Sequence, residues 1–586
     1  MRIEELASLI KKPEWAKLGI SERGELTFAC FDQAKKTGKN PKSLAEEATK
    51  YVHGDIINKV EAANGYVNIY LDFNKIFKLM QKNLGAPLNS SFSKKNVFLE
   101  HTSVNPNKAL HIGHIRNSYI GEFLRRALKR AESNVITANF VEDTGTQVAD
   151  IVVAFKLLKK PIDTNMKFDL YCSKVYKEVN EEYSKDEKLL ELRRGVLQKI
   201  ESGDKETVDF LRETVLKILS GQMETLNKQG IEYDLLNMES YILSSGLIGR
   251  ALAILKEKHV VYSPKEGKNA GCIVIKYGDK ERVLRRSDGT SLYVSKDIAY
   301  ALWKHGILKE DVKWKEFMKN PDGSQIFLSE YDGKSKALGK YDMSITLVDS
   351  EQNDEQEAVS YAVKSLDNSV NYIHYSYEMV ALSKETAEAM GLDVDSRFAK
   401  MSGRKGITIE VDPLLSRLTE KIIQTARENK KSLSEGDAFK LASNVLRYSL
   451  LKVSPSKMVI FDMEEALNIK GDTAVYINYA YARAKHILDN LKPQKNSDYK
   501  FDPDEEKILR RMMFWRETFK ESIEKMKANI LCDYLHGLCD SFNWFYEKNR
   551  VIGSERESER SAVVNMFVDI VAEVSSILGL FLVANV

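Results

Sequence analysis

The chain has 586 residues, of which 43% are hydrophobic and 30% charged, and its formal net charge is +3. This length predicts about three or four domains, and the composition excludes a fibrous or largely disordered protein. The balance of 88 basic and 85 acidic residues neither requires nor excludes a nucleic-acid partner, because a basic face can be hidden in a balanced total.

Cysteine spacing and hydropathy limit the class of protein further. The five cysteines form no Cys-x-x-Cys pair, so neither a disulfide framework nor a zinc site is expected, and we predict a reducing, cytoplasmic location. No run of about 18 apolar residues occurs, so we expect no membrane span. The early charged residues also argue against a secretory signal. The apolar residues 577–584 predict a buried terminal helix.

Residues 1–88 predict a small α+β domain. The sequence Asn-Pro-Lys-Ser at residues 40–43 precedes a stretch that we predict to be helical to about residue 63. Residues 65–71 alternate as a half-buried strand does. The polar residues 88–95 indicate a linker.

The next segment predicts a β-α-β unit. Residues 96–100 are typical of a buried strand, residues 111–132 have helical apolar spacing, and residues 135–141 predict a second strand. Such a unit implies a parallel sheet with a ligand site at the carboxyl ends of its strands.

The remaining sequence divides into three regions. Residues 156–230 are rich in lysine and glutamate and helical in pattern, which indicates an insertion. Strand–helix alternation returns between about 230 and 410, and from about 415 onward the pattern is nearly all helix. We therefore predict domains at 1–88, 89–415 and 416–586, the second of α/β Rossmann-like type and the third an all-α bundle.

Two histidines open the predicted helix in the sequence His-Ile-Gly-His, at His111 and His114. Imidazole N–H groups at a helix N-terminus can donate to phosphate oxygens, and the helix dipole adds partial positive charge. Gly113 has no side chain, so a flat base can approach the backbone there. The alternative is that both histidines only cap and pack the helix, and these residues alone leave both interpretations open.

A basic loop, Lys-Met-Ser-Gly-Arg-Lys, follows at residues 400–405. Such a loop suits a mobile clamp on a triphosphate, because its cations offset charge at the transferring phosphorus. Alone, it could be an exposed basic turn. The His-Ile-Gly-His segment upstream favours the phosphate interpretation.

These two motifs resemble the HIGH and KMSKS signatures of class I aminoacyl-tRNA synthetases. The resemblance implies a catalytic domain that binds ATP, with Mg²⁺, through His111, Gly113, His114, Lys400, Met401 and Ser402. The usual second KMSKS lysine is absent at Gly403 and Arg404. Arginyl enzymes often lack it, and a lysine just upstream of HIGH is thought to compensate. By that resemblance the catalytic set is Lys108, His111, His114 and Lys400, with Lys405 as a rival to Lys108.

Candidate ligands for the amino acid lie beside these motifs. A guanidinium is planar and bidentate, so it needs carboxylate or phenol partners in a fixed arrangement. The sequence Asp-Gly-Thr-Ser-Leu-Tyr-x-x-x-Asp at residues 288–297 resembles arginyl-tRNA synthetases specifically. That resemblance assigns Glu100, Tyr293 and Asp297 to the guanidinium, and Ser103, Asn105 and Gln352 to the α-amino and carboxylate end. The alternative for Tyr293 and Asp297 is an ordinary helix. Residues 142–147 also resemble the family, without an assigned role.

Two further regions resemble parts of the same family that contact tRNA. Tyr476, Tyr479 and Arg483 share one predicted helix face in a region similar to the helical anticodon-binding domain. Such a face can stack on unpaired bases, although a core stripe is the common alternative. The first 88 residues resemble the N-terminal domain that approaches the tRNA elbow, with Asn68 as the candidate contact. The family often ends in methionine, whereas this chain ends in Val586.

The resemblance implies that the chain ligates L-arginine to tRNA(Arg) through an arginyl-adenylate, with ATP as substrate. We expect a monomer that needs no zinc and no membrane. One rival is a class I synthetase for lysine or cysteine, although the cysteine spacing argues against the latter. A non-enzymatic rival is an RNA-binding paralogue that has lost activity.

Overall fold

The computed structural model describes residues 1–586 apart from 22, 164, 187, 337–339, 393–397, 401–408, 492–497 and 585–586, and apart from the side chains of 201, 399 and 400. The chain divides into two compact units. The first unit comprises Met1–Ser91, Ala426–Asn444 and Leu467–Val586, and the second comprises Phe92–Thr425 and Val445–Ala466. Helices α15 (Val411–Glu428) and α16 (Glu435–Leu451) each belong partly to both.

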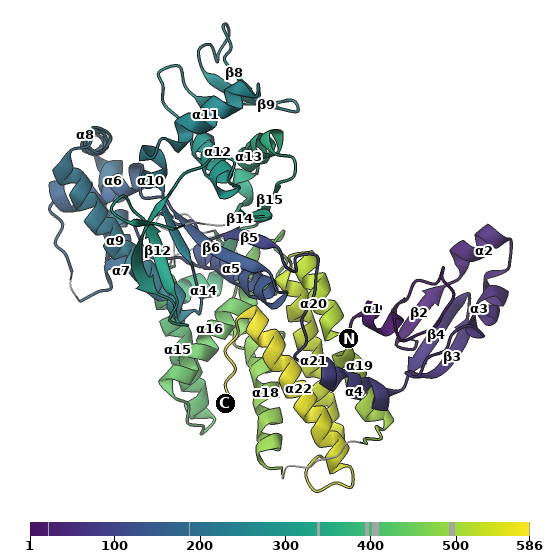
Figure 1. The fold of residues 1–586 in the computed structure, drawn as a ribbon. Coiled ribbons are helices and arrows are strands. Elements are labelled where there is room, and N and C mark those ends of the chain that lie inside the picture. Colours follow the sequence, from purple (N-terminus) through teal and green to yellow (C-terminus); the bar gives the residue numbers. More distant parts are fainter. Residues whose placement is uncertain are drawn as a thin grey trace. The chain divides into compact units, whose positions relative to one another are not determined.

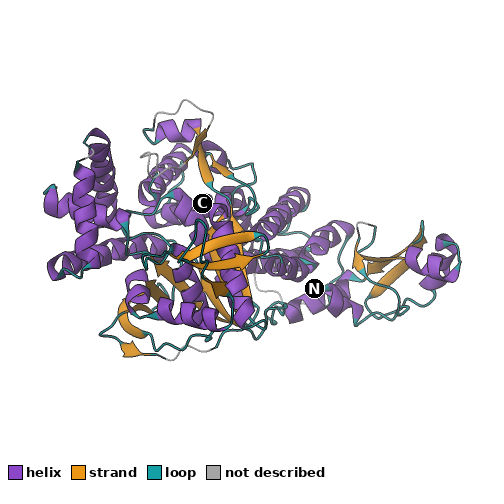
Figure 2. Cartoon of the chain, turned by 90° about the horizontal axis from the view of Figure 1, so that it is seen from above, coloured by secondary structure: helices purple, strands orange, loops and turns teal. Residues whose placement is uncertain are grey.

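The N-terminal part of the first unit is an antiparallel sheet in the order β1-β2-β4-β3. Its elements are β1 (Gly19–Ile20), β2 (Leu26–Ala29), β3 (Ile57–Ala63) and β4 (Tyr66–Leu71), with α1 (Ile3–Ala7), α2 (Phe31–Thr37), α3 (Pro41–Thr49) and α4 (Phe73–Asn83). Figure 2 shows these strands in orange at one end of the first unit, with helix beside them.

The helix predicted to reach residue 63 is wrong beyond Thr49. Asn40 caps α3 as expected, because its side chain accepts from the Lys42 N–H. Residues 57–63, however, form strand β3, which pairs with β4 through the turn at Asn64 and Gly65. Both turn residues have positive φ, at 52° and 86°, which is the geometry that an Asn-Gly hairpin turn adopts. That dipeptide was the available signal.

The remainder of the first unit is helical, as predicted. Its elements are α18 (Ala474–Asp489), α19 (Pro503–Met513), α20 (Trp515–Glu524), α21 (Ala528–Lys548) and α22 (Glu557–Leu578). The predicted terminal helix is wrong after Leu578, because Gly579 adopts φ 75° and ends α22. Residues 580–584 form no regular secondary structure, and the side chains of Asn444 and Asn478 each pair with their backbone, at Phe581 and Val583.

Helix α22 is long and apolar enough to pass a length-and-composition test for a membrane span. The share of its most apolar window that is buried inside the protein is 61%. The core helix of a soluble protein passes the same test, so this helix is weak evidence for a membrane.

The second unit is built on an eight-stranded sheet in the order β13-β11-β12-β7-β6-β5-β14-β15. The six strands from β12 to β15 in that order run parallel. The strands are β5 (Asn96–Glu100), β6 (Asn134–Val141), β7 (Leu235–Met238), β11 (Lys313–Lys319), β12 (Gln325–Ser329), β13 (Lys334–Ser335), β14 (Met343–Asp349) and β15 (Asn371–Tyr377). The predicted β-α-β unit is confirmed as β5, α5 (Ile112–Arg130) and β6, and Figure 1 shows α5 running along β5 and β6.

Helices and two small sheets surround this parallel core. The helices are α6 (Thr146–Val152), α7 (Phe168–Lys185), α8 (Leu189–Glu201), α9 (Lys205–Lys228), α10 (Glu239–Ser244), α11 (Leu247–Glu257), α12 (Tyr293–Lys304), α13 (Asn353–Leu366), α14 (Lys384–Ala389) and α17 (Met463–Ala466). A π-helical turn, Val153–Leu157, extends α6. One small sheet is β8 (Val261–Tyr262), β9 (Ile273–Tyr277) and β10 (Lys280–Arg285); the other is β16 (Val380–Ser383), β17 (Phe398–Lys400) and β18 (Val459–Phe461).

Candidate active site

A cavity of about 420 Å³ opens at the carboxyl ends of β5, β6 and β14. In the sheet, β6 and β7 lie on one side of β5, whereas β14 and β15 lie on the other. The order of the strands therefore reverses at β5, which makes β5 a topological switch point of the sheet. Ligands of parallel sheets bind at such points. His114 lines the cavity. So do all six residues predicted to contact arginine, which are Glu100, Ser103, Asn105, Tyr293, Asp297 and Gln352.

The buried end of the cavity carries an ion pair that the sequence did not reveal. Lys304, at the end of α12, donates to Glu100 across 2.5 Å and to the Thr346 hydroxyl across 3.1 Å. Its ammonium also lies 4.6 Å from the Tyr300 ring centroid and 5.7 Å from that of Tyr372. Aromatic faces attract a desolvated cation, so the charge of Glu100 is compensated inside the protein.

Asp297 and Glu142 also line the cavity, and neither forms an ion pair among the residues that the structure describes. Burial, followed by the repulsion of Glu100, raises the pKa of Asp297 to about 7. Burial, followed by the repulsion of Glu239, raises the pKa of Glu142 to about 7. The hydroxyl of Tyr300, which is buried beside them, has no hydrogen-bond partner in the structure. These groups are arranged for a positively charged ligand that carries N–H donors.

A second internal ion pair lies nearer the mouth. Lys296 donates to Glu239 across 2.6 Å, and the Thr144 hydroxyl donates to the same carboxylate. The Lys296 ammonium stands 4.5 Å from the ring centroid of Tyr293, which is the first residue of α12 and is 69% exposed. Tyr293 and Asp297 therefore share α12 as predicted, with Tyr293 at the cavity mouth.

The loop after β5 is held in a strained conformation by two asparagines. Thr102 and Ser103 have φ of 78° and 45°, a region that residues other than glycine rarely adopt. The Asn117 side chain accepts from the Thr102 N–H at 2.6 Å, and the Asn139 side chain accepts from the Ser103 N–H at 2.9 Å. The Ser103 hydroxyl has no hydrogen-bond partner in the structure, although it lines the cavity. Strain of this kind concentrates at functional sites.

Gln352 and Asp349 form the third wall. Asp349 ends β14, and its carboxylate accepts from the Glu351 N–H, which starts the 3₁₀ turn Ser350–Gln352. Gln352 ends that turn, lines the cavity and is exposed.

The histidine pair caps α5 and also reaches the cavity. Nδ1 of His111 accepts from the N–H groups of Gly113 and His114, and the two imidazoles stack with centroids 3.3 Å apart. Burial lowers the pKa of His111 to about 3 and that of His114 well below its usual value, so both rings are neutral. Because Nδ1 of His111 is an acceptor, its proton lies on Nε2, where it can be donated. A Cβ at Gly113 would come within 3.0 Å of the His111 ring, so the glycine makes room for that ring.

Comparison with known proteins identifies the family. Models for the arginyl tRNA synthetase N-terminal domain, the class I (R) tRNA synthetase catalytic domain and the DALR anticodon binding domain match residues 6–71, 76–329 and 477–585. The arginine–tRNA ligase of Thermococcus kodakarensis is 30% identical over 577 residues, spanning 90% of this chain and 88% of that protein. That of Pyrococcus furiosus is 31% identical over 580 residues, with the same coverage. The chain belongs to the arginine–tRNA ligase family.

Solved structures agree with this family. The arginyl-tRNA synthetase of Thermus thermophilus superposes with a TM-score of 0.83 at 28% identity, covering 97% of this chain and 96% of that chain. The Plasmodium falciparum arginyl-tRNA synthetase has the same fold, with a TM-score of 0.73 at 17% identity over 98% of this chain and 95% of that one. The predicted fold class is confirmed: a class I catalytic domain with an N-terminal α+β domain and a C-terminal helical domain.

The KMSKS-like loop of this family member is described only at its two ends. The side chain of Lys400, and Met401, Ser402 and Lys405, lie outside the described residues. Before the loop, β17 pairs with β16; after it, the Ile112 N–H donates to the Ile409 carbonyl and the Val411 N–H to the Leu110 carbonyl. The segment that carries the histidines therefore anchors the loop at its far end.

Arg116, one turn beyond the histidines on α5, anchors the near end. It is fully buried, and its guanidinium donates to backbone carbonyls that flank β16 and precede β18: those of Glu378, Met379, Ser454 and Lys457. This contact fixes the small sheet that starts the KMSKS-like loop onto the HIGH helix. No pattern in the sequence indicated a role for Arg116.

Lys108 does not line the cavity. Its ammonium lies 5.4 Å from the ring centroid of Tyr176 on α7, and burial lowers its pKa. The insertion also holds the backbone around it, because Gln222 on α9 donates to the carbonyls of Asn105 and Lys108. The predicted insertion therefore supports the loop between β5 and α5.

The residues predicted to contact tRNA lie in the first unit. Tyr479, which is 39% exposed, borders a hollow of about 420 Å³ together with Lys431 and Arg483. The Arg483 guanidinium lies 4.6 Å from the Tyr479 ring centroid, and the Tyr476 hydroxyl donates to Asp540 at 2.6 Å. Asn68 is only 5% exposed on β4.

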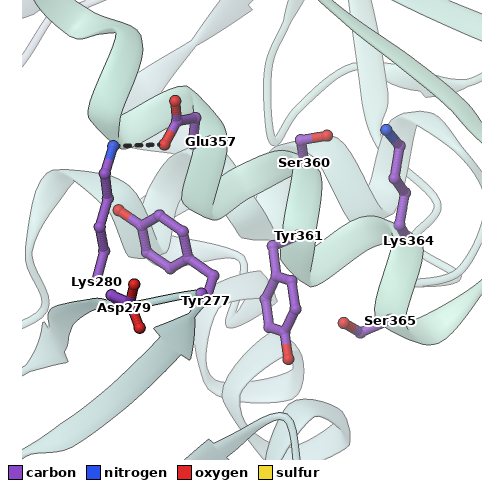
Figure 3. A pocket seen from close by; sticks show the side chains of 9 residues that line it. Tyr277, Asp279, Lys280, Glu357, Ser360, Tyr361, Lys364 and Ser365 are labelled. Atoms are coloured by element: carbon purple, nitrogen blue, oxygen red, sulfur yellow. Dashed lines mark hydrogen bonds and ion pairs between the residues drawn. The ribbon is translucent and has the colours of Figure 1, made fainter.

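A second hollow in the catalytic unit, of about 650 Å³, lies between the β9–β10 hairpin and α13 (Figure 3). Tyr277 and Tyr361 line it, but Lys280 is already paired with Glu357 at 2.7 Å and with Asp354 at 2.7 Å. The charge of Lys280 is thus compensated and solvent-exposed. Among the residues that the structure describes, no cluster of three or more potential metal ligands occurs.

Proposed function

We propose that the cavity at the ends of β5, β6 and β14 holds L-arginine beside ATP. As a member of its family, the chain ligates arginine to tRNA in two steps: ATP-dependent formation of arginyl-adenylate, then transfer to the 3′-terminal adenosine of tRNA(Arg). Catalysis consists mainly of positioning and of charge stabilisation at the α-phosphorus, as in other phosphoryl-transfer reactions.

Asp297 is the observation that carries the arginine assignment. It is a part-buried carboxylate that lines the cavity and forms no ion pair among the residues that the structure describes, and burial, followed by the repulsion of Glu100, raises its pKa. A guanidinium supplies the charge and two parallel donors. Glu100 and Tyr293 complete the proposed guanidinium site, and the Tyr300 hydroxyl adds an unused acceptor.

The α-amino and carboxylate end of arginine faces the strained loop and the turn after β14. Ser103 contributes a hydroxyl without a partner, and Asn105 and Gln352 contribute amides. This arrangement supports our assignment of these three residues to the α-amino and carboxylate end of the substrate.

The nucleotide end lies at the N-terminus of α5. Neutral His111 and His114 donate from Nε2 to phosphate oxygens, while the helix N-terminus adds partial positive charge. Lys400, Met401 and Ser402 close on the ATP from the KMSKS-like loop, and Mg²⁺ arrives with ATP as part of the substrate. Lys108 or Lys405 supplies the missing second lysine; Lys108 must leave Tyr176 to do so.

Binding of tRNA is assigned to the first unit. Tyr476, Tyr479 and Arg483 contact the anticodon region, and the N-terminal sheet, with Asn68, approaches the elbow. We further propose that the enzyme is a cytoplasmic monomer that uses no zinc and no membrane. All five cysteines are buried and none of them forms a disulfide, which agrees with a reducing compartment.

The decisive experiment is aminoacylation of total tRNA with each labelled amino acid in turn. Arginine alone should be incorporated, because Asp297 and the neutralised Glu100 fit a planar cation rather than a compact ammonium. Preferential charging with lysine would support the rival synthetase, and failure to form any adenylate would support the inactive RNA-binding paralogue.

A further inference from the structure

The charges of the site cavity do not balance without a ligand. Its acidic lining includes Glu100 and Glu239, each in an ion pair with a lysine, at 2.5 Å to Lys304 and 2.6 Å to Lys296. Asp297 and Glu142 have no such partner among the described residues, and Asp349 and Glu355 add two more carboxylates to the lining. The carboxylates of the cavity therefore outnumber its two lysines, and the guanidinium proposed for Asp297 offsets only part of the excess.

Glu142 lies just beyond the carboxyl end of β6. In the register of the sheet, Glu100 is opposite Ala138 on β6, so Glu142 is four residues further along the chain than the residue opposite Glu100. Glu142 and Asn105 line the same cavity, and Asn105 belongs to the end of the cavity assigned to the α-amino group. When the cationic side chain of a long amino acid binds Asp297, its α-ammonium group lies toward this end of the cavity.

Asp143, the residue next to Glu142, has a structural role in the same loop. Asp143 points out of the cavity and accepts from both the N–H, at 2.8 Å, and the hydroxyl, at 2.6 Å, of Ser240 at the start of α10. Among the residues that the structure describes, Glu142 makes no such contact with a helix end. Lys296, a cation whose charge acts on it, already donates to Glu239.

We infer that Glu142 binds the α-ammonium of the substrate and so selects amino acids over otherwise identical acids that lack the amino group. This inference rests on the proposed function. It makes Glu142 a specificity-determining residue: the carboxylate and the Asn105 amide together recognise the ammonium, whereas Asp297 recognises the side chain.

The test compares two ligands in three variants. L-arginine and 5-guanidinopentanoate, which is arginine without its α-amino group, are titrated into the full-length protein by calorimetry. We expect Glu142→Gln to raise the dissociation constant of arginine about tenfold to a hundredfold, the usual range for the loss of a charge-assisted hydrogen bond. The dissociation constant of 5-guanidinopentanoate should change by no more than about twofold. Glu142→Asp, which keeps the charge, should restore part of the loss.

Glu355→Gln is the matched control, because it removes a different carboxylate from the lining of the same cavity. It should leave the ratio of the two affinities unchanged within about twofold. Since burial makes an ionised Glu142 costly, Glu142→Gln should melt no lower than the wild type, which excludes misfolding as the cause of a lost affinity.

The outcomes separate the two proposals. If wild-type protein binds neither ligand in the cavity, the proposed function itself fails. If it prefers arginine strongly but Glu142→Gln keeps that preference, or loses both ligands equally, the role of Glu142 is contradicted while the arginine site stands.

Discussion

Lys304 and Glu100 form a buried ion pair, 2.5 Å from Nζ to Oε2, at the inner end of the arginine cavity. Glu100 therefore meets the substrate with its charge already compensated, and Asp297, seven residues before Lys304 on α12, is left without a cation. One helix thus carries both the internal cation and the acid proposed to bind the external one.

The first prediction concerns Lys304. Lys304→Met leaves Glu100 buried without its counter-charge, so the free energy of unfolding should fall by about 3–5 kcal/mol, the usual effect of breaking one side of a buried pair. The double variant Lys304→Met/Glu100→Gln should recover most of that loss. Urea unfolding of the three proteins measures it; equal destabilisation of the single and double variants would show that the two side chains do not interact.

The second prediction concerns pH. Arginine binds the ionised forms of Asp297 and Glu142, whose pKa values are both raised to about 7 in the empty site. Below pH 7 they must first release protons, so arginine affinity should rise between about pH 6 and 8 and level off above. Calorimetry in buffers of different ionisation enthalpy should detect proton release at pH 6.5, and Asp297→Asn should reduce it. An arginine affinity that falls as the pH rises would contradict this prediction.

The same shifts predict the stability of the ligand-free protein. Because the folded-state pKa values of these carboxyls lie above their ordinary values, the folded state binds more protons than the unfolded state between about pH 4 and 7. Their contribution to stability is therefore present at low pH and lost as pH rises through 7. Asp297→Asn should flatten this part of the profile, measured as melting temperature against pH.

The fourth prediction concerns Arg116, which positions the KMSKS-like loop without touching substrate. Arg116→Lys keeps the charge but cannot bind the carbonyls before β16 and those before β18 at once, so kcat for adenylate formation should fall at least about tenfold. The arginine dissociation constant should stay within about twofold, since Arg116 does not line the cavity. A parallel loss of arginine affinity would indicate general disruption.

The fifth prediction concerns tRNA. Tyr479→Ala removes an exposed ring that Arg483 holds in place, so the KM for tRNA should rise about tenfold, the usual worth of one stacked base. Arginine affinity should be unchanged. Tyr546→Ala is the matched control, because that ring also contacts Arg483 but does not border the hollow.

Local patterns in the sequence predicted the catalytic core closely. The strand at Asn96–Glu100 matched its prediction, and α5 began at Ile112, one residue after the predicted start, because buried strands and long amphipathic helices are specified by nearby side chains. All six predicted arginine ligands line one cavity, since the carboxyl ends of parallel strands meet at one sheet edge. Strand β3 was missed because the apolar spacing was given more weight than the Asn64-Gly65 turn.

The relationships between distant residues could not be predicted in the same way. Lys304 and Glu100 are 204 positions apart, and a lysine ending a helix is usually solvated. Arg116 is charged, yet it is buried because four carbonyls from two separate segments surround it. These partners are set by the tertiary fold, and no local pattern names them.

The central claim is that Asp297 supplies the uncompensated charge that recognises arginine. Its most direct test is the arginine dissociation constant of Asp297→Asn, measured by calorimetry on the full-length protein beside the wild type. We expect arginine to bind about a hundredfold more weakly or worse, while ATP affinity stays within about twofold and the ligand-free protein melts no lower. Arginine binding within threefold of the wild type would contradict the account.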